Sequence, residues 1–271
     1  MTSSSVIPES KYAEANGIRL HYKEWSTEGP PLVFLHGVTS NCGSWDVVAP
    51  NFVERRHVMA IDLRGHGLSD KPESGYEWEP HYAPDIVDFI ATHLGEPAIV
   101  VGHSLGAVVA AAVAVQAGDR VRAIVMEDPP SFTHENRDGT ISRFKPTLEA
   151  KRLPFDQRVD ALMASMRIDR EAATVRAESL GAMSEQVLVE LVEGETAYRA
   201  EVLLPKVSCP VLAVLGNPSR GGVVDWANRP RLQRLMRRAT IVEWPDVGHG
   251  IHSEQPQRFV AEIDSFFARL S

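Results

Sequence analysis

The sequence is poor in cysteine, which excludes one common way of stabilising a fold. Its 271 residues include only Cys42 and Cys209. Two cysteines cannot build the disulfide framework of a small secreted domain, and they give no indication of metal ligation. We expect each of the two thiols to be small and half-buried. Because 44% of the residues are hydrophobic, we also expect a sizeable apolar core.

Long apolar runs are also missing. No segment approaches the roughly 18 consecutive apolar residues that read as a membrane-spanning helix. The N-terminus, MTSSS, lacks the basic stretch and the apolar stretch of a secretory signal. The sequence therefore predicts a protein that does not associate with membranes and that resides in the cytoplasm.

Neither sign of charge is concentrated in one part of the chain. The 28 Lys and Arg residues and the 36 Asp and Glu residues are interspersed, with a formal net charge of −8. This distribution excludes the basic surface that nucleic acids or anionic membranes need. The expected partner is a small molecule, and these patterns do not fix an oligomeric state.

Short apolar, β-branched runs alternate with longer amphipathic segments. This alternation predicts an α/β fold with a mostly parallel sheet flanked by helices. The runs are continuously apolar, as buried parallel strands are. The expected strands are Pro31–Leu35, His57–Ile61, Ala98–Val101, Val121–Met126, Pro210–Leu215 and Ala239–Trp244.

The alternation breaks between about Ser131 and Lys206, where only helical periodicity is found. We expect residues 131–206 to form a helical cap, inserted after the strand that ends near Met126. Residues 1–130 and 207–271 would then form the α/β core. Open α/β sheets bind ligands at the carboxyl ends of their strands, so the cap is expected to cover that edge.

One motif carries chemistry: Gly102-His-Ser-Leu-Gly106 follows an expected strand and opens an Ala-rich helix. A G-x-S-x-G sequence in this context is typical of a sharp turn that exposes a nucleophilic serine. We therefore predict Ser104 as the nucleophile.

A serine hydroxyl needs a base and an oxyanion hole to act on a carbonyl group. The predicted base is His249, in a Gly-flanked loop after the last strand, whereas His252 is expected to be a surface or packing residue. The predicted oxyanion donors are the backbone N–H groups of Leu105 and Val38. His36 is expected to stabilise the loop that carries Val38.

The sequence resembles the α/β-hydrolase superfamily, in its small esterase, lactonase and haloperoxidase-like branch. The matching segments include FLHGVTSN (34–41), IDLRGHGLSD (61–70), GHSLGAVVAA (102–111) and DVGHGIHSEQPQRF (246–259). The resemblance implies a helical cap and a hydrolase that uses no metal and no cofactor. Related dehalogenases and epoxide hydrolases use an aspartate nucleophile, so Ser104 argues against both activities.

The carboxylate that should orient His249 is the open question. In similar proteins it commonly follows the strand that ends here at Leu215, but that place is taken by Ser219. Some relatives place the acid after the preceding strand, in a register that falls on Asp128. Adjacent carboxylates at a strand end point to opposite sides, so only one of Glu127 and Asp128 is expected to meet His249. We predict Asp128, with Glu127 and Asp225 as alternatives.

These residues predict a serine hydrolase that cleaves a carboxylic ester or lactone of a small, largely apolar molecule. A C–C bond hydrolase or a perhydrolase would use the same triad. A small-molecule receptor or regulator with a vestigial triad is an alternative from another class. Phe144, Met163, Met166, Met183 and Trp45 are apolar residues that either line a pocket or pack in the core.

Overall fold

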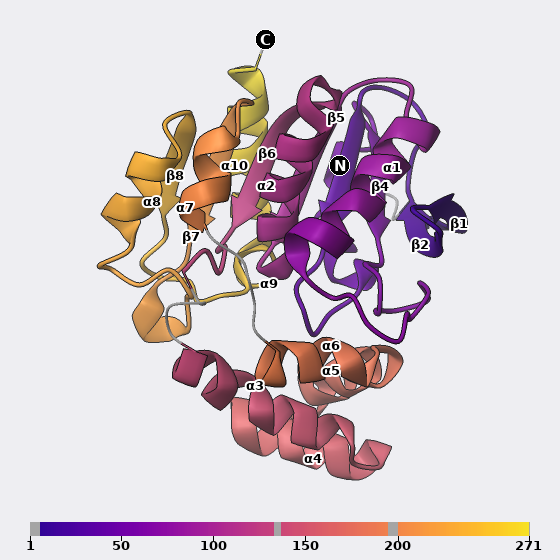
Figure 1. The fold of residues 1–271 in the computed structure, drawn as a ribbon, viewed down its shortest axis with the longest axis vertical. Coiled ribbons are helices and arrows are strands. Elements are labelled where there is room, and N and C mark those ends of the chain that lie inside the picture. Colours follow the sequence, from indigo (N-terminus) through magenta and orange to yellow (C-terminus); the bar gives the residue numbers. More distant parts are fainter. Residues whose placement is uncertain (1–5, 133–136, 195–199, 271) are drawn as a thin grey trace.

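The computed structural model describes residues 6–132, 137–194 and 200–270. Their strands form one sheet in the order β1-β2-β4-β3-β5-β6-β7-β8 (Figure 1). The hairpin β1–β2 and the β2–β4 pair are antiparallel, and every junction from β4 to β8 is parallel. The predicted α/β class with a mostly parallel sheet is confirmed. The strands are β1 (Glu9–Ala15), β2 (Ile18–Glu24), β3 (Pro31–Leu35), β4 (His57–Ile61), β5 (Ala98–His103), β6 (Val121–Glu127), β7 (Val211–Leu215) and β8 (Ala239–Glu243).

The hairpin β1–β2 was not among the strands expected from the sequence. Its residues are largely polar, because much of its surface faces solvent. Asn16 and Gly17 form the turn with φ values of 50° and 75°. Positive φ at both turn residues is the geometry that an Asn-Gly hairpin favours. The Asn-Gly sequence of this turn could have predicted the two strands.

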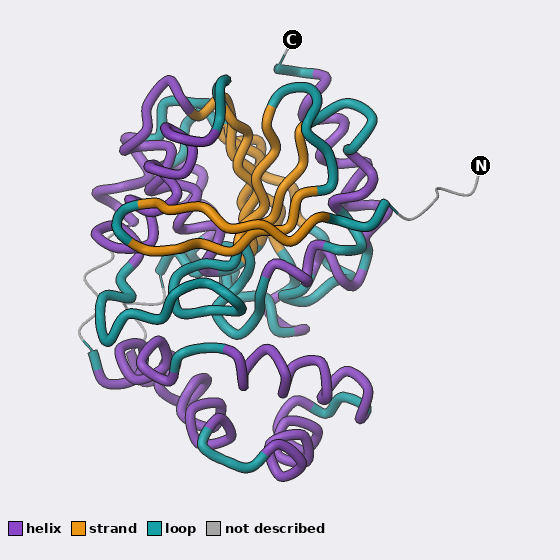
Figure 2. The backbone as a smooth tube through the Cα atoms, turned by 90° about the vertical axis from the view of Figure 1, so that its right-hand side faces the viewer, coloured by secondary structure: helices purple, strands orange, loops and turns teal. Residues whose placement is uncertain are grey.

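The sheet separates two hydrophobic cores because side chains alternate along each strand. On β3, Val33 and Leu35 enter one core, and Leu32 and Phe34 enter the other. Helices cover both faces of the sheet, as Figures 1 and 2 show. The first core is closed by α1 (Ala83–His93), α2 (Leu105–Ala117), α7 (Ala200–Leu203) and α8 (Arg229–Leu235), and the second by α9 (Ile251–Glu254) and α10 (Pro256–Ala268).

A separate group of helices, here called the helical layer, lies below the sheet in Figure 1. It touches loops that follow strand ends: Asn41 donates to Ser179 Oγ at 3.0 Å, and the Ser184 N–H donates to Gly65 O at 2.6 Å. The described part of 131–206 contains helices and no strand. The division of the chain into a core of residues 1–130 and 207–271 and a cap of residues 131–206 stays a prediction. The layer comprises α3 (Arg137–Lys151), α4 (Phe155–Met166), α5 (Arg170–Ala182) and α6 (Glu185–Glu193).

The chain reverses its direction of travel across the sheet at β3. It passes from β3 to β4 on one side and then to β5 on the other. Such a switch point leaves a crevice between the two loops that leave the neighbouring strands, which is where open α/β sheets bind ligands. None of the helices in the described residues is long and apolar enough to cross a membrane.

Candidate active site

Ser104 occupies a strained turn between β5 and α2. Its φ of 51° and ψ of −114° lie outside the regions that serine ordinarily adopts. The turn requires glycine on both sides: a Cβ on Gly102 would lie 2.1 Å from Gly106 O, and one on Gly106 would lie 2.2 Å from Leu35 O. Strain of this kind persists at functional sites where the surroundings impose it. The local geometry is that of the predicted nucleophile turn.

The two predicted oxyanion donors lie at the switch point. Val38 follows β3 and Leu105 begins α2, and both line the same cavity. Neither backbone N–H donates to an acceptor within the described residues. A Cβ placed on Gly37 would lie 3.4 Å from Ser104 Cβ, so the loop that carries Val38 runs beside the serine. Both N–H groups are therefore free for a ligand next to Ser104.

His36 holds this loop in place, as expected. The Leu63 N–H donates to His36 Nε2 at 3.0 Å, and His36 Nδ1 donates to Gly37 O at 2.8 Å. Burial lowers the pKa of His36 below its usual value, which keeps the ring neutral and suits one accepting and one donating nitrogen. The loop is thus fixed before any substrate binds.

Asp128 and His249 meet across the site. Asp128 is fully buried just after β6, with a φ of 42°. Its Oδ2 lies 2.6 Å from His249 Nδ1. A carboxylate only accepts, so His249 carries its proton on Nδ1 and leaves Nε2 as a base. His103, beside Ser104 in the chain, donates to His249 O at 3.0 Å and brings that loop to the serine turn.

The loop after β7 contacts Asp128 through its backbone. The Val223 N–H donates to Asp128 Oδ2 at 2.9 Å, and the Gly216 N–H contacts Oδ1 at 3.3 Å. Asp225 is exposed and accepts from the Asn228 N–H at 2.8 Å. The alternative that placed the acid at Asp225 therefore has no contact with His249 among the described residues.

Glu127 forms a second pair, with His252. Its carboxylate accepts the His252 backbone N–H at 2.9 Å and lies 2.8 Å from His252 Nδ1. The opposite orientations of Glu127 and Asp128 agree with the expectation that only one meets His249. His252, which was expected to be a surface or packing residue, is a packing residue: it is 4% exposed and stacks on Trp45 at a centroid distance of 4.3 Å.

Replacing Glu127 by glutamine is expected to lower kcat about tenfold, with little change in KM. The amide oxygen can take the place of Oε1, but the NH₂ group then faces the His252 Nδ1 proton that Oε2 accepts now, and a buried unsatisfied group costs about 1–3 kcal/mol. The loop that carries His249 would then lose one of its anchors. Steady-state kinetics and thermal unfolding measure both effects. Glu178→Gln, an exposed change on α5, is the matched control, and an unchanged kcat in Glu127→Gln would refute the anchoring role.

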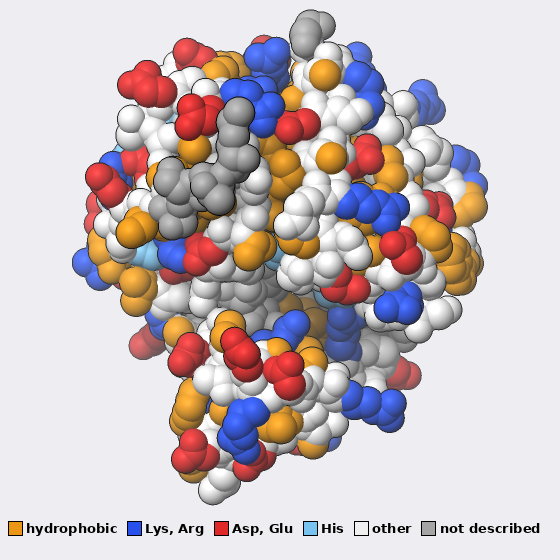
Figure 3. Space-filling view, turned by 180° about the vertical axis from the view of Figure 1, so that it is seen from behind, with side chains coloured by type: hydrophobic (Ala, Val, Ile, Leu, Met, Phe, Trp, Pro, Cys, Tyr) orange, Lys and Arg blue, Asp and Glu red, His pale blue; other side chains and the backbone are white. Residues whose placement is uncertain are grey.

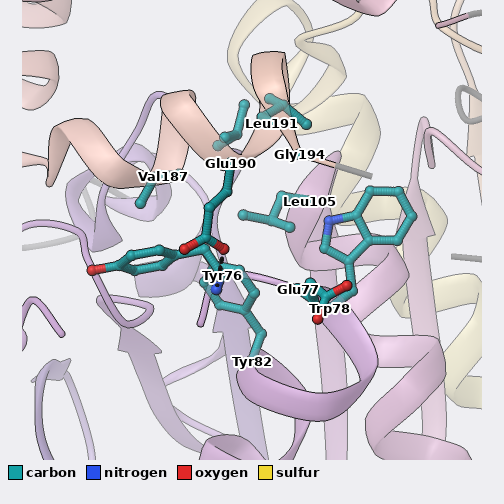
Figure 4. Close-up of a pocket in the computed structure, with 10 residues that line it drawn as sticks. Tyr76, Glu77, Trp78, Tyr82, Leu105, Val187, Glu190, Leu191 and Gly194 are labelled. Atoms are coloured by element: carbon teal, nitrogen blue, oxygen red, sulfur yellow. Dashed lines mark hydrogen bonds between the residues drawn. The ribbon is translucent and has the colours of Figure 1, made fainter. Parts of the chain in front are cut away.

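A cavity of about 240 Å³ lies beside the site (Figure 4): Val38 and Leu105 line it, whereas Ser104 and His249 do not. Tyr76, Trp78 and Tyr82 contribute aromatic surface, and α6 forms the opposite wall. Glu190 of α6 accepts the N–H groups of Gly75 at 3.0 Å and Tyr76 at 2.9 Å, which ties the helical layer to this segment. The lining residues are Val38, Tyr76, Glu77, Trp78, Tyr82, Leu105, Val187, Glu190, Leu191 and Gly194.

Tyr82, which lines the cavity, carries an unused polar group in the surrounding core. The Tyr82 hydroxyl is buried and has no hydrogen-bond partner in the described structure. Burial raises its pKa well above the usual value, so it remains a donor. Sequence reasoning missed the 76–82 segment, although its density of aromatic residues was a signal. Phe144, Met163, Met166, Met183 and Trp45 do not line this cavity.

Two groups of residues in the described structure have the ligand types of a metal site. These groups are His21 with Cys42 and Asp62, and His103 with Glu127 and His252. Within each group the ligand atoms lie within 4.8 Å of one another. Both carboxylates already accept N–H groups of the protein. Their contacts are those of hydrogen-bonded pairs.

The profile of the alpha/beta hydrolase family matches residues 32–262. The chain belongs to this family, and its class is that of a hydrolase. It is 31% identical to a 2-(acetamidomethylene)succinate hydrolase of Mesorhizobium japonicum, over 95% of this chain and 94% of that protein. It is 26% identical to an N-formylmaleamate deformylase of Pseudomonas putida, over 94% and 92% of the two chains. A crystal structure of E-2-(acetamidomethylene)succinate hydrolase superposes with a TM-score of 0.83 at 29% identity, covering 96% of this chain and 99% of the other.

Proposed function

We propose that this hydrolase cleaves a carboxylic ester or lactone through an acyl-enzyme on Ser104. The observation that carries the proposal is the pairing of His249 with buried Asp128 beside a strained serine turn. These are the elements of a nucleophile, its base and the group that orients the base. The free N–H groups of Val38 and Leu105 supply the remaining element, two donors for an oxyanion.

In the first half of the reaction, Ser104 Oγ attacks the substrate carbonyl carbon and His249 Nε2 takes the serine proton. The negative charge on the carbonyl oxygen is stabilised by the Val38 and Leu105 N–H groups. Asp128 stabilises the imidazolium that forms. The C–O bond to the alcohol then breaks, and the alcohol leaves with the proton from His249.

In the second half, water replaces the alcohol. His249 removes a proton from water, and the hydroxide attacks the acyl carbon of the acyl-enzyme. The bond to Ser104 breaks, the proton returns to Oγ, and the carboxylic acid leaves. Every step uses groups of this chain and water, so the mechanism calls for no metal and no cofactor.

The acyl group is proposed to occupy the aromatic cavity. Its volume of about 240 Å³ and its largely apolar, aromatic lining suit a small acyl chain. A panel of p-nitrophenyl esters and lactones of increasing size tests this proposal. We expect short and medium acyl chains to react fastest. No turnover anywhere in the panel, together with no fluorophosphonate labelling of Ser104, would favour the receptor alternative.

A second candidate is hydrolysis of an amide that carries a carboxylate. The two relatives named above are a succinate-derivative hydrolase and a maleamate deformylase. In this chain, Arg143 and Arg176 are exposed residues of α3 and α5. Partial desolvation lowers the pKa of both guanidinium groups, and the Asp128 charge raises that of Arg143, which shows that its guanidinium lies within electrostatic range of Asp128. Neither guanidinium pairs with a carboxylate of the described residues, and Figure 3 shows Lys and Arg side chains along the hollow beside the helical layer.

Replacing Arg143 by glutamine tests whether the site binds a substrate carboxylate, as the second candidate requires. If Arg143 binds a substrate carboxylate, KM for p-nitrophenyl hemisuccinate rises about tenfold or more, because a charged hydrogen bond contributes about 1.5–3 kcal/mol. KM for the neutral p-nitrophenyl butyrate stays the same. Arg170→Gln, which removes an exposed arginine paired with Asp160, is the matched control. Equal changes for both esters would exclude a carboxylate-binding role.

A further inference from the structure

A second chain of serine, histidine and aspartate runs from the β1 edge of the sheet to the end of β4. Ser10 Oγ is 2.8 Å from His21 Nε2, and His21 Nδ1 is 2.8 Å from Asp62 Oδ2. The three residues come from β1, β2 and the end of β4. Neither the sequence motifs nor the mechanism at Ser104 accounts for this arrangement.

Asp62 fixes the state of His21. Its carboxylate accepts the Cys42 N–H at 2.7 Å and the Leu68 N–H at 2.9 Å. Hydrogen bonds from His21 and these N–H groups outweigh burial and hold the pKa of Asp62 well below its usual value. An ionised carboxylate only accepts, so His21 carries its proton on Nδ1. The lone pair on Nε2 therefore faces the Ser10 hydroxyl, which donates to it.

The base is buried and held rigidly, whereas the serine is accessible. His21 and Asp62 are 3% and 2% exposed, and Ser10 is exposed on the edge strand. The His21 N–H donates to Ser69 Oγ at 2.8 Å, and a Cβ on Gly67 would lie 2.0 Å from Asp62 Oδ2. A buried, oriented base next to an exposed hydroxyl is the geometry that activates a nucleophile.

A metal site explains these contacts less well. Cys42 Sγ is 3.9 Å from His21 Nδ1 and completes a possible ligand set. Burial, and then the Asp62 charge, raise the pKa of the Cys42 thiol far above its usual value, so the thiol keeps its proton. The Nδ1 atom is also committed to Asp62.

One positive charge lies beside the serine, and another lies further along the same face of the hairpin, opposite Glu14. Lys23 is the register partner of Ser10, and Arg19 lies two positions before His21. Lys23 pairs with Asp46 at 2.8 Å, which leaves only part of its charge for a ligand. No pair of free backbone N–H groups like that at Ser104 faces Ser10 in the described structure. Since each oxyanion donor contributes a factor of about 10²–10³ to the rate, Ser10 should react far more slowly than Ser104.

We propose that Ser10, His21 and Asp62 form a second nucleophilic centre, at which Ser10 takes an acyl group from an activated carboxylic ester. Ser10 Oγ forms a bond to the acyl carbon while its proton moves to His21 Nε2. The bond from that carbon to the aryloxide breaks, and the aryloxide leaves with the electron pair and receives the proton. The serine ester that forms has a much poorer leaving group than the aryl ester, and without oxyanion donors its attack by water is slow, so the acyl group stays on Ser10. The centre is a site of covalent modification and not of turnover.

The test uses the full chain with Ser104→Ala, so that acylation at the first site is removed. Incubation with p-nitrophenyl acetate is expected to release p-nitrophenolate in a single phase that approaches one equivalent. Mass spectrometry of the intact protein and of its peptides should place one acetyl group on Ser10. The double variant with Ser10→Ala should lose this phase, and the one with His21→Gln should show it at least tenfold slower.

Ser253 provides the internal control, because it is exposed but its hydroxyl contacts only the Gly250 carbonyl at 2.9 Å. It should stay unmodified. Because Ser10 is exposed, the Ser10→Ala double variant is expected to have the same melting temperature as Ser104→Ala. The Ser10→Ala result therefore decides the proposal even if the His21→Gln variant fails to fold. Acetyl groups found only on lysines, or equally on Ser10 and Ser253, or an unchanged phase in the Ser10→Ala double variant, would overturn the proposal.

Discussion

Replacing Ser104 by alanine is expected to abolish multiple turnover of a short p-nitrophenyl ester. The loss in kcat should be on the order of 10⁶, as for other serine hydrolases that lose their nucleophile. No other hydroxyl in the described residues lies in the strained turn beside the free Val38 and Leu105 N–H groups. Binding should survive, because the cavity walls are unchanged, so a substrate analogue should keep its Kd.

The measurement is steady-state release of p-nitrophenolate, with fluorophosphonate labelling as a second readout. The wild-type chain should be labelled rapidly and stoichiometrically on Ser104. Ser253→Ala, an exposed change, should retain full activity. If Ser104→Ala kept wild-type turnover, both the nucleophile and the acyl-enzyme would have to be abandoned.

Replacing Asp128 by asparagine should lower kcat by about 10²–10⁴, because the imidazolium of His249 loses its counter-charge. The amide can keep the Nδ1–H tautomer only if its oxygen takes the place of Oδ2. Its NH₂ group then faces the Gly216 N–H, which now contacts Oδ1. Part of the loss should therefore be in stability. Thermal unfolding separates this effect from kcat.

The matched control for this variant is Asp225→Asn, which changes the same residue type in the loop where the acid is more usual. Asp225 is exposed and bonded to Asn228, so kcat should stay within about twofold of wild type. The reverse result, with a large loss in Asp225→Asn and none in Asp128→Asn, would move the acid to the later loop.

Much of the fold could be predicted because buried parallel strands are apolar throughout. The six expected strands all occur, with bounds that differ by at most two residues. The hairpin β1–β2 was not predicted, because a strand with one solvated face contains many polar residues and resembles a loop in a search for apolar runs. The contact between Ser10 and His21 was not predicted either, since residues 11 positions apart meet here only through strand pairing.

The candidate active-site residues also divide into those that a local pattern predicts and those that only contacts between distant segments define. The turn at Ser104 depends on local sterics, because two glycines and a strand-to-helix junction suffice to define it. The aromatic segment 76–82 acquires its role only from α6, more than a hundred residues later in the chain, through Glu190. No local pattern encodes such a contact.

The sequence by itself determined the α/β class, the nucleophile turn and the short list of acids, because each follows from local periodicity or from spacing within one motif. Only the tertiary structure decided how the adjacent carboxylates Glu127 and Asp128 are shared between His252 and His249. It also assigned the loop after β7, which lacks the usual acid, to hold Asp128 through its backbone N–H groups. Those outcomes depend on the register of β6 against β7 and on how the chain closes over the sheet, and both are set by packing between segments distant in sequence.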